Sequence, residues 1–86
     1  MVSETITIQL KTGLHARPAS QLVALCKEFK STVMLHYGEK KAPANSILKL
    51  LSLGLSNGSQ VEIAVEGEDE AQALGQVLDF MKNLEE

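Results

Sequence analysis

The amino-acid sequence predicts an α+β domain in which helices cover one face of an antiparallel sheet. Runs of alternating apolar and polar residues, the pattern of strands with one buried face, occur near the start, the middle and the end of the chain. Segments with apolar residues at helical spacing lie between and after these runs. The length of 86 residues fits one compact unit, so we expect a single two-layer domain over residues 1–86 with the order βαββαβα.

The first strand is expected from Glu4 to Leu10, where every second residue is apolar. The first helix is expected from about residue 16 to 28, with a buried stripe formed by Ala19, Leu22, Val23 and Cys26. Cys26 is the only cysteine and cannot form an internal disulfide. Its apolar surroundings predict a buried and unreactive thiol.

The next two strands should form a hairpin. The alternating run from Thr32 to Tyr37 meets Gly38, and the polar stretch from Glu39 to Ala42 follows it. Lys40 and Lys41 in this stretch suit an exposed edge strand, where charge discourages pairing with another chain. His36 lies in the alternating run, and we assign it a solvent-facing or structural position.

The second half of the chain predicts a short helix, a strand and a long helix. Asn45 and Ser46 are both candidate N-cap residues for the apolar run ILKLLSLG, which Gly54 can terminate. After the Asn57–Gly58 turn, a strand is marked by alternating Val61, Ile63 and Val65. In the last helix, Asp69 and Gln72 resemble a capping box. Its expected apolar stripe is Ala71, Leu74, Val77 or Leu78, Met81 and Leu84.

Charge and composition exclude several classes of function. A formal net charge of −3 with 3% aromatic residues argues against a nucleic-acid-binding protein, which needs a basic face and stacking partners. No apolar run is long enough to cross a membrane and the N-terminus does not read as a signal peptide, so we expect a cytoplasmic protein. Nucleotide-binding fingerprints are absent and His15, His36 and Cys26 lack metal-ligand spacing, so we expect no cofactor and no metal.

The segment GLHARPA, residues 13–19, contains the residues that suggest a chemical function, the binding of a phosphoryl group. A helix starting between residues 15 and 18 leaves the backbone N–H groups of Ala16 and Arg17 without intrahelical partners, and the Arg17 guanidinium can bind phosphate oxygens. The positive end of the helix helps keep His15 neutral and nucleophilic, which suits reversible phosphoryl capture. The local chemistry equally allows His15 to be a simple cap with Arg17 a solvated charge.

Four segments in order resemble the HPr family, the histidine-containing phosphocarriers of the phosphoenolpyruvate-dependent sugar phosphotransferase system. They are GLHARPA, NSILKLLSLGL, SNGSQVEI and GEDEAQAL, and the similarity runs almost end to end. The resemblance implies an open-faced sandwich, a four-stranded antiparallel sheet covered by three helices. It also implies a carrier in a phosphotransferase relay rather than an enzyme with turnover of its own.

The resemblance assigns roles to individual residues and partners. His15 would accept phosphate on a ring nitrogen from the charged first enzyme of the system and pass it to permease A components. Arg17 would steady the phosphoryl group, and the Ala16 and Arg17 amides would bind its oxygens. We expect the carrier to act as a monomer.

Ser46 is implied as the target of a serine kinase, with a phosphatase or a transcription regulator as further partners. At position 49 the family carries glycine or lysine, and glycine is the residue associated with this regulation, so Lys49 counts against it. Ser46 could equally serve only as the N-cap of the helix. A candidate docking patch for partners consists of Leu14, Ile47, Leu48, Lys49 and Leu51, any of whose apolar members could instead be core.

Two alternatives to the sugar branch stay open. Residues 43–46, PANS, resemble the nitrogen-related branch of the family, whereas SLGL and GEDEAQAL resemble the sugar branch, which we prefer. The other alternative is a regulatory binding module that acts through Ser46 and the neighbouring apolar patch. The regulatory paralogue that lacks the active histidine is disfavoured because His15 is present.

Overall fold

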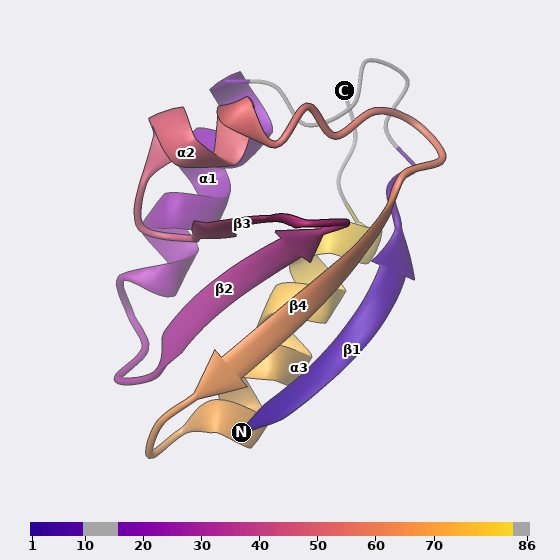
Figure 1. Ribbon diagram of the computed structural model, residues 1–86. Coiled ribbons are helices and arrows are strands. Elements are labelled where there is room, and N and C mark those ends of the chain that lie inside the picture. The colour runs from indigo at the N-terminus through magenta and orange to yellow at the C-terminus, as the bar shows by residue number, and fades with distance from the viewer. Residues whose placement is uncertain (10–15, 84–86) are drawn as a thin grey trace.

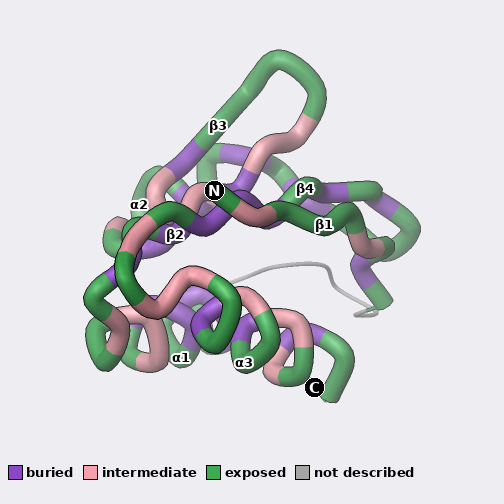
Figure 2. Tube along the Cα trace, turned by 90° about the horizontal axis from the view of Figure 1, so that it is seen from below, coloured by how far each residue is buried: buried purple, intermediate pink, exposed green. Residues whose placement is uncertain are grey.

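The computed structural model describes residues 1–9 and 16–83, and confirms a four-stranded antiparallel sheet with three helices. The elements in chain order are β1 (Val2–Thr7), α1 (Ala16–Cys26), β2 (Thr32–Tyr37), β3 (Lys40–Pro43), α2 (Ile47–Ser52), β4 (Gln60–Glu66) and α3 (Glu70–Lys82). The order of strands across the sheet is β1-β4-β2-β3 (Figure 1). Helices α1 and α3 lie side by side beneath one face of the sheet, as Figure 2 shows, so the architecture is an open-faced α+β sandwich.

The core lies between the sheet and its helices. It is built from aliphatic side chains, as expected for a chain with 3% aromatic residues. The largest fully buried side chains are Leu22, Leu35, Leu50, Leu53, Val61, Ile63, Val65 and Val77. The central strand β4 supplies three of them, because its alternate residues face the helices while Glu62 and Glu66 face solvent.

The boundaries of β1 differ from the prediction. The strand runs from Val2 to Thr7 rather than from Glu4 to Leu10, because its partner β4 offers a register from Val65 opposite Val2 to Gln60 opposite Thr7. Ile8 follows the strand and is buried; its N–H donates to Ser59 O at 2.8 Å and its carbonyl accepts from Gly58 N at 2.8 Å. Leu10 lies outside the described residues.

Helix α1 is two residues shorter than predicted, because its last turn tightens. Beyond Cys26, the N–H groups of Glu28 and Phe29 donate to carbonyls three residues earlier, at 3.1 and 3.3 Å. The predicted stripe is otherwise confirmed, with Ala19, Leu22 and Val23 buried and Cys26 partly buried.

The hairpin and its edge strand are confirmed. Within residues 1–9 and 16–83, β3 pairs with β2 alone, so Lys40 and Lys41 stand on an edge of the sheet. Gly38 makes the turn between the two strands with φ of 60°, a value that favours glycine.

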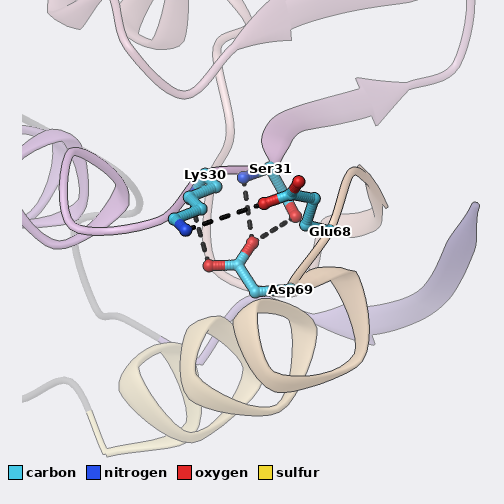
Figure 3. Close-up of polar contacts among 4 residues, drawn as sticks. All are labelled: Lys30, Ser31, Glu68 and Asp69. Atoms are coloured by element: carbon cyan, nitrogen blue, oxygen red, sulfur yellow. Dashed lines mark hydrogen bonds and ion pairs between the residues drawn. The ribbon is translucent and has the colours of Figure 1, made fainter.

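Asp69 is the N-cap residue of α3, but the predicted capping box is wrong. The Asp69 side chain makes no bond to its own helix. Its carboxylate instead accepts from the N–H groups of Lys30 at 3.0 Å and Ser31 at 2.9 Å, and from the Ser31 hydroxyl (Figure 3). The Asp69 side chain therefore bonds to the turn between α1 and β2, and not to the start of α3 as the local pattern predicted. No sequence signal marks a contact across 38 residues.

The apolar stripe of α3 is shifted by tertiary packing. Its buried members are Ala73, Val77 and Met81. Leu74 and Leu78 are partly buried, and Ala71 is exposed, contrary to the prediction. The predicted stripe residue Leu84 lies outside the described part of the chain.

Candidate functional site

Helix α1 begins at Ala16, within the predicted interval. Ala16 and Arg17 are exposed, whereas Pro18 is buried in the first turn. In a helix that starts here, the N–H groups of Ala16 and Arg17 cannot bond within the helix, and Pro18 has none to satisfy. The described residues therefore offer two backbone donors and a guanidinium at an exposed helix start. His15 and Leu14 lie outside the described residues, so their predicted roles stay predictions.

Helix α2 begins with a capped turn. Of the two candidate N-caps, Ser46 is the one used; its backbone is extended, with φ of −133° and ψ of 111°, and its hydroxyl accepts from Lys49 N at 3.4 Å. Its carbonyl accepts the first helical bond from Leu50 N at 3.0 Å. Asn45 is exposed and precedes the cap. The Ser46 hydroxyl is thus hydrogen-bonded to the first turn of α2, and the residue is still partly accessible to solvent.

The proposed docking residues of α2 separate into exposed and packed side chains. Leu48 is 81% exposed and Ile47 is 39% exposed, and Lys49 is also at the surface. Leu51 is only partly exposed and packs against the core cluster. The exposed apolar surface of α2 is therefore narrower than the predicted patch, and consists of Ile47 and Leu48.

Helices α1 and α2 pack against each other, and α2 also packs against β3. Figure 1 shows α2 on the same side of the molecule as the end at which α1 begins. The fold thus brings the start of α1, whose first turn includes Arg17, to the same side of the molecule as α2, although Arg17 and Ile47 are 30 positions apart in sequence.

The remaining titratable candidates do not form a second centre. Burial raises the pKa of the Cys26 thiol to about 11, in keeping with the unreactive thiol that the sequence predicts. His36 is partly buried in β2, opposite Lys41 and Glu62 on the neighbouring strands. Among residues 1–9 and 16–83, no three or more His, Cys, Asp or Glu side chains are grouped to hold a metal ion.

A hollow that the sequence did not indicate lies beside the approach to Ser46. It has a volume of about 240 Å³, and its walls come from the end of α1, the start of β2 and the β3–α2 connection, including Cys26, Lys27 and Asn45. The lining residues fall into two stretches, 26–33 and 43–45, which the fold brings together, so only tertiary structure reveals the hollow. In the same described part of the chain, no helix has both the length and the apolar character needed to span a membrane.

Comparisons with known proteins agree with this fold and arrangement. The HPr-like protein Crh of Bacillus subtilis (strain 168) is 40% identical over 82 residues, which cover 95% of this chain and 96% of that protein. Phosphocarrier protein HPr of Haemophilus influenzae is 39% identical over 85 residues, which cover 99% of this chain and all of that protein, 100%.

Solved structures match closely too. The crystal structure of HPr-C-His from Thermoanaerobacter tengcongensis has a TM-score of 0.90 and 40% identity, and the match covers 95% of this chain and 92% of that one. A crystal structure of an HPr dimer from the same organism matches with a TM-score of 0.75 and 40% identity, over 95% and 94% of the two chains.

The family model described as the PTS HPr component phosphorylation site matches residues 2–83, nearly the whole chain. The match includes GLHARPA, the exposed start of α1 and the capped start of α2. The chain therefore belongs to the HPr family of phosphocarrier proteins.

Proposed function

We propose that this protein relays a phosphoryl group through His15, from the phosphoenolpyruvate-charged first enzyme of the phosphotransferase system to sugar-permease A components. The observation that carries the proposal is the family match over residues 2–83 to a phosphorylation-site model, in a chain that has a histidine directly before the exposed start of α1. The protein is a carrier, because its two partners supply and remove the phosphoryl group.

The start of α1 supports this chemistry. A phosphoryl group on His15 would lie next to two backbone donors and the guanidinium of Arg17, which stabilise its negative oxygens. In the forward step a bond forms between a His15 ring nitrogen and phosphorus while the bond from phosphorus to the donor enzyme breaks. The second step repeats this exchange with the permease component as acceptor. No oxidant, reductant or cofactor is needed.

Docking is assigned to the exposed side chains of α2. Leu48 and Ile47 provide a small apolar centre, and Arg17 and Lys49 provide a basic rim that suits acidic partner surfaces. An interface of this kind favours brief encounters, which a shuttling carrier requires. We place this carrier in the cytoplasm and assign transfer to a single chain.

The decisive experiment compares the two histidines. The purified protein is incubated with phosphoenolpyruvate and the first enzyme, and acid-labile phosphate is followed by phosphorus NMR. His15→Ala should abolish labelling, whereas the matched control His36→Ala, in strand β2, should retain it. Labelling that survives in His15→Ala would refute the assignment. Labelling only by a nitrogen-branch first enzyme would move the protein to that branch.

A regulatory binding module is the second candidate, favoured by the 40% identity to the HPr-like protein Crh and by the partly accessible Ser46. Phosphorylation would add about −1.5 to −2 charges at a helix start, where the dipole accepts negative charge. Incubation with ATP and a bacterial HPr serine kinase should label the protein but not Ser46→Ala, with Ser52→Ala of the same helix as control. Absence of labelling in the unmodified protein would remove this candidate.

A further inference from the structure

The connection between α2 and β4 contains the pair Asn57–Gly58 in an exposed turn. Gly58 has φ of 93°, a conformation that residues other than glycine rarely adopt, so the turn requires glycine here. An added Cβ would meet no atom within 4 Å, so backbone conformation, and not crowding, imposes this requirement. The consequence is chemical, because the backbone nitrogen that follows Asn57 is not shielded by a side chain.

An asparagine is a labile residue, and one that precedes glycine can modify itself. The Gly58 nitrogen attacks Cγ of Asn57. A bond forms between these two atoms, the bond from Cγ to Nδ2 breaks, and the leaving nitrogen takes up the proton that the Gly58 nitrogen loses, so ammonia departs. The product is a succinimide ring. Water then opens the ring at either carbonyl carbon and gives aspartate or isoaspartate at position 57. The overall change is uptake of water and release of ammonia, without oxidation or reduction.

In the folded chain the attacking nitrogen is hydrogen-bonded. Gly58 N donates to Ile8 O at 2.8 Å, and Ile8 N donates to Ser59 O at 2.8 Å. The turn is closed by Ser59 N, which donates to Ser56 O at 3.0 Å. Figure 1 shows this connection passing the end of β1. Ring closure needs the Gly58 nitrogen to lose its proton and the turn to change its backbone angles, so the bond to Ile8 must open first.

A buried serine side chain holds the turn in this form. Ser59 is 9% exposed, and its hydroxyl accepts from Ser56 N at 3.0 Å. The same hydroxyl lies 3.2 Å from the Ser56 hydroxyl and donates to the Tyr37 hydroxyl at 3.4 Å. Tyr37 is the last residue of β2, so these bonds tie the turn to the sheet. Opening of the turn therefore has to break the bonds of Ser59 as well as the bond to Ile8.

We propose that Asn57 is a self-modification site of the folded protein, at which deamidation is controlled by opening of the hydrogen bond between Gly58 N and Ile8 O. The reaction needs no enzyme, and its only co-reactant is water. The fold both creates the site, by requiring glycine at position 58, and slows the reaction, by bonding the nitrogen of that glycine. The proposal does not depend on phosphoryl transfer.

The two products change the protein differently. Aspartate at position 57 keeps the backbone and adds one negative charge. Isoaspartate adds the same charge and also inserts a carbon atom into the backbone before Gly58. The turn from Ser56 to Ser59 then cannot close in the same register, and both backbone groups of Ile8 lose their partners. A slow change in an exposed turn thus removes the bonds that hold the chain just beyond the end of β1.

The test follows the full chain at mildly alkaline pH, in buffer and in concentrated urea. Peptide mapping by mass spectrometry measures conversion at each asparagine, and an isoaspartate methyltransferase detects isoaspartate. Asn45, which precedes a serine, and Asn83, which precedes a leucine, are internal comparisons. In buffer, conversion should be confined to Asn57. In urea, Asn57 should convert roughly tenfold faster, the factor expected when opening costs about as much as one hydrogen bond.

Variants separate control by the turn from the chemistry of the pair itself. Ser59→Ala removes the hydroxyl that holds the turn, so Asn57 should convert faster in buffer, and hydrogen exchange of the Gly58 amide should rise by a similar factor. In urea this variant and the unmodified protein should react equally fast. The matched control is Ser52→Ala, which removes a hydroxyl bonded to Lys49 O outside the turn and should leave both rates unchanged.

The unmodified protein provides a second measurement should Ser59→Ala disturb the whole fold. In a urea series below the unfolding transition, conversion of Asn57 and hydrogen exchange of the Gly58 amide should rise together, because both need the same opening. Hydrogen exchange at Ile8 should increase in the fraction that carries isoaspartate and stay unchanged in Asn57→Asp.

Three results would overturn the proposal. The first is conversion of Asn57 in buffer that is absent, or no faster than that of Asn45 or Asn83. The second is an equal rate at Asn57 in buffer and in urea, because the turn would then give no protection. The third is a conversion rate in buffer that does not follow the exchange of the Gly58 amide, because a different motion would then control the reaction.

Discussion

At the scale of single residues, Asp69 links the turn between β4 and α3 to the turn between α1 and β2, which is distant in sequence. Its carboxylate binds the Ser31 hydroxyl and the Lys30 and Ser31 N–H groups, and these bonds hold its pKa below the usual value, the Ser31 hydroxyl contributing most. The turns also touch at Gly67, where an added Cβ would lie 2.5 Å from the Ser31 Cα. The absence of a side chain at Gly67 lets the two turns approach each other closely enough for these bonds.

This contact predicts a dependence of stability on pH. Because folding lowers the pKa of Asp69, its contribution is complete at neutral pH and is lost as the pH falls below about 4, the ordinary pKa of an aspartate. Asp69→Asn should lower the melting temperature at pH 7, and the difference from the unmodified protein should shrink in acid. Thermal unfolding followed by circular dichroism measures both.

The matched control is Glu68→Gln, next to Asp69. Glu68 Oε2 lies 3.7 Å from Lys30 Nζ, and both side chains are well exposed. Removing the charge of Glu68 should therefore change the melting temperature little at any pH. An equal effect of the two substitutions would show that general charge, rather than the bonds of Asp69, accounts for the result.

Ser46 and Asn45 give a second prediction at this scale. Ser46→Ala removes the cap of α2 and should lower the free energy of unfolding by about 0.5–2 kcal/mol, whereas Asn45→Ala should have a much smaller effect. Urea unfolding distinguishes them. Both residue types are good N-caps, so the sequence predicts two candidates. Only the extended backbone at Ser46 identifies it as the N-cap of α2.

At the scale of elements, α2 places core and surface leucines side by side. Leu48 is 81% exposed and Leu50 is fully buried, although both belong to the six-residue helix α2, of which four residues are apolar. Periodicity could not separate them, because a run with apolar residues on every side has no preferred face. The packing of α2 against α1 and β3 decides which side chains turn inward.

This division predicts opposite effects for neighbouring substitutions. Leu50→Ala should lower the free energy of unfolding by about 2–5 kcal/mol, as expected for a buried leucine. Leu48→Ala should leave unfolding nearly unchanged and should slow phosphoryl transfer to and from partners. Urea unfolding and rapid-quench transfer measurements test the two parts. Normal transfer by Leu48→Ala would remove this residue from the docking surface.

At the scale of the whole molecule, the fold combines an acidic chain with a locally basic site. The formal net charge is −3, yet Arg17 and Lys49 stand at the surface of two helices that pack together. Overall charge alone would predict poor attraction to acidic partners. Local charge governs encounter rates over a Debye length, about 10 Å at moderate salt.

Lys49→Glu should therefore slow transfer from the first enzyme, most strongly at low ionic strength. Lys82→Glu makes the same change of charge at the end of α3 and serves as the control, with a smaller expected effect. Transfer rates measured across a salt series provide the test. Equal slowing by the two variants would mean that net charge, and not the surface around α2, steers the partners.

The sequence alone was sufficient for the order of the elements, the edge position of β3 and the family. These features follow from alternation, turn residues and motifs, which act over a few neighbouring residues. Tertiary structure decided the limits of β1, the partner of Asp69, the buried face of α3 and the exposed leucine of α2. Each of these depends on contacts between segments far apart in the chain, and the energy of such contacts exceeds the small local preferences that a sequence pattern records.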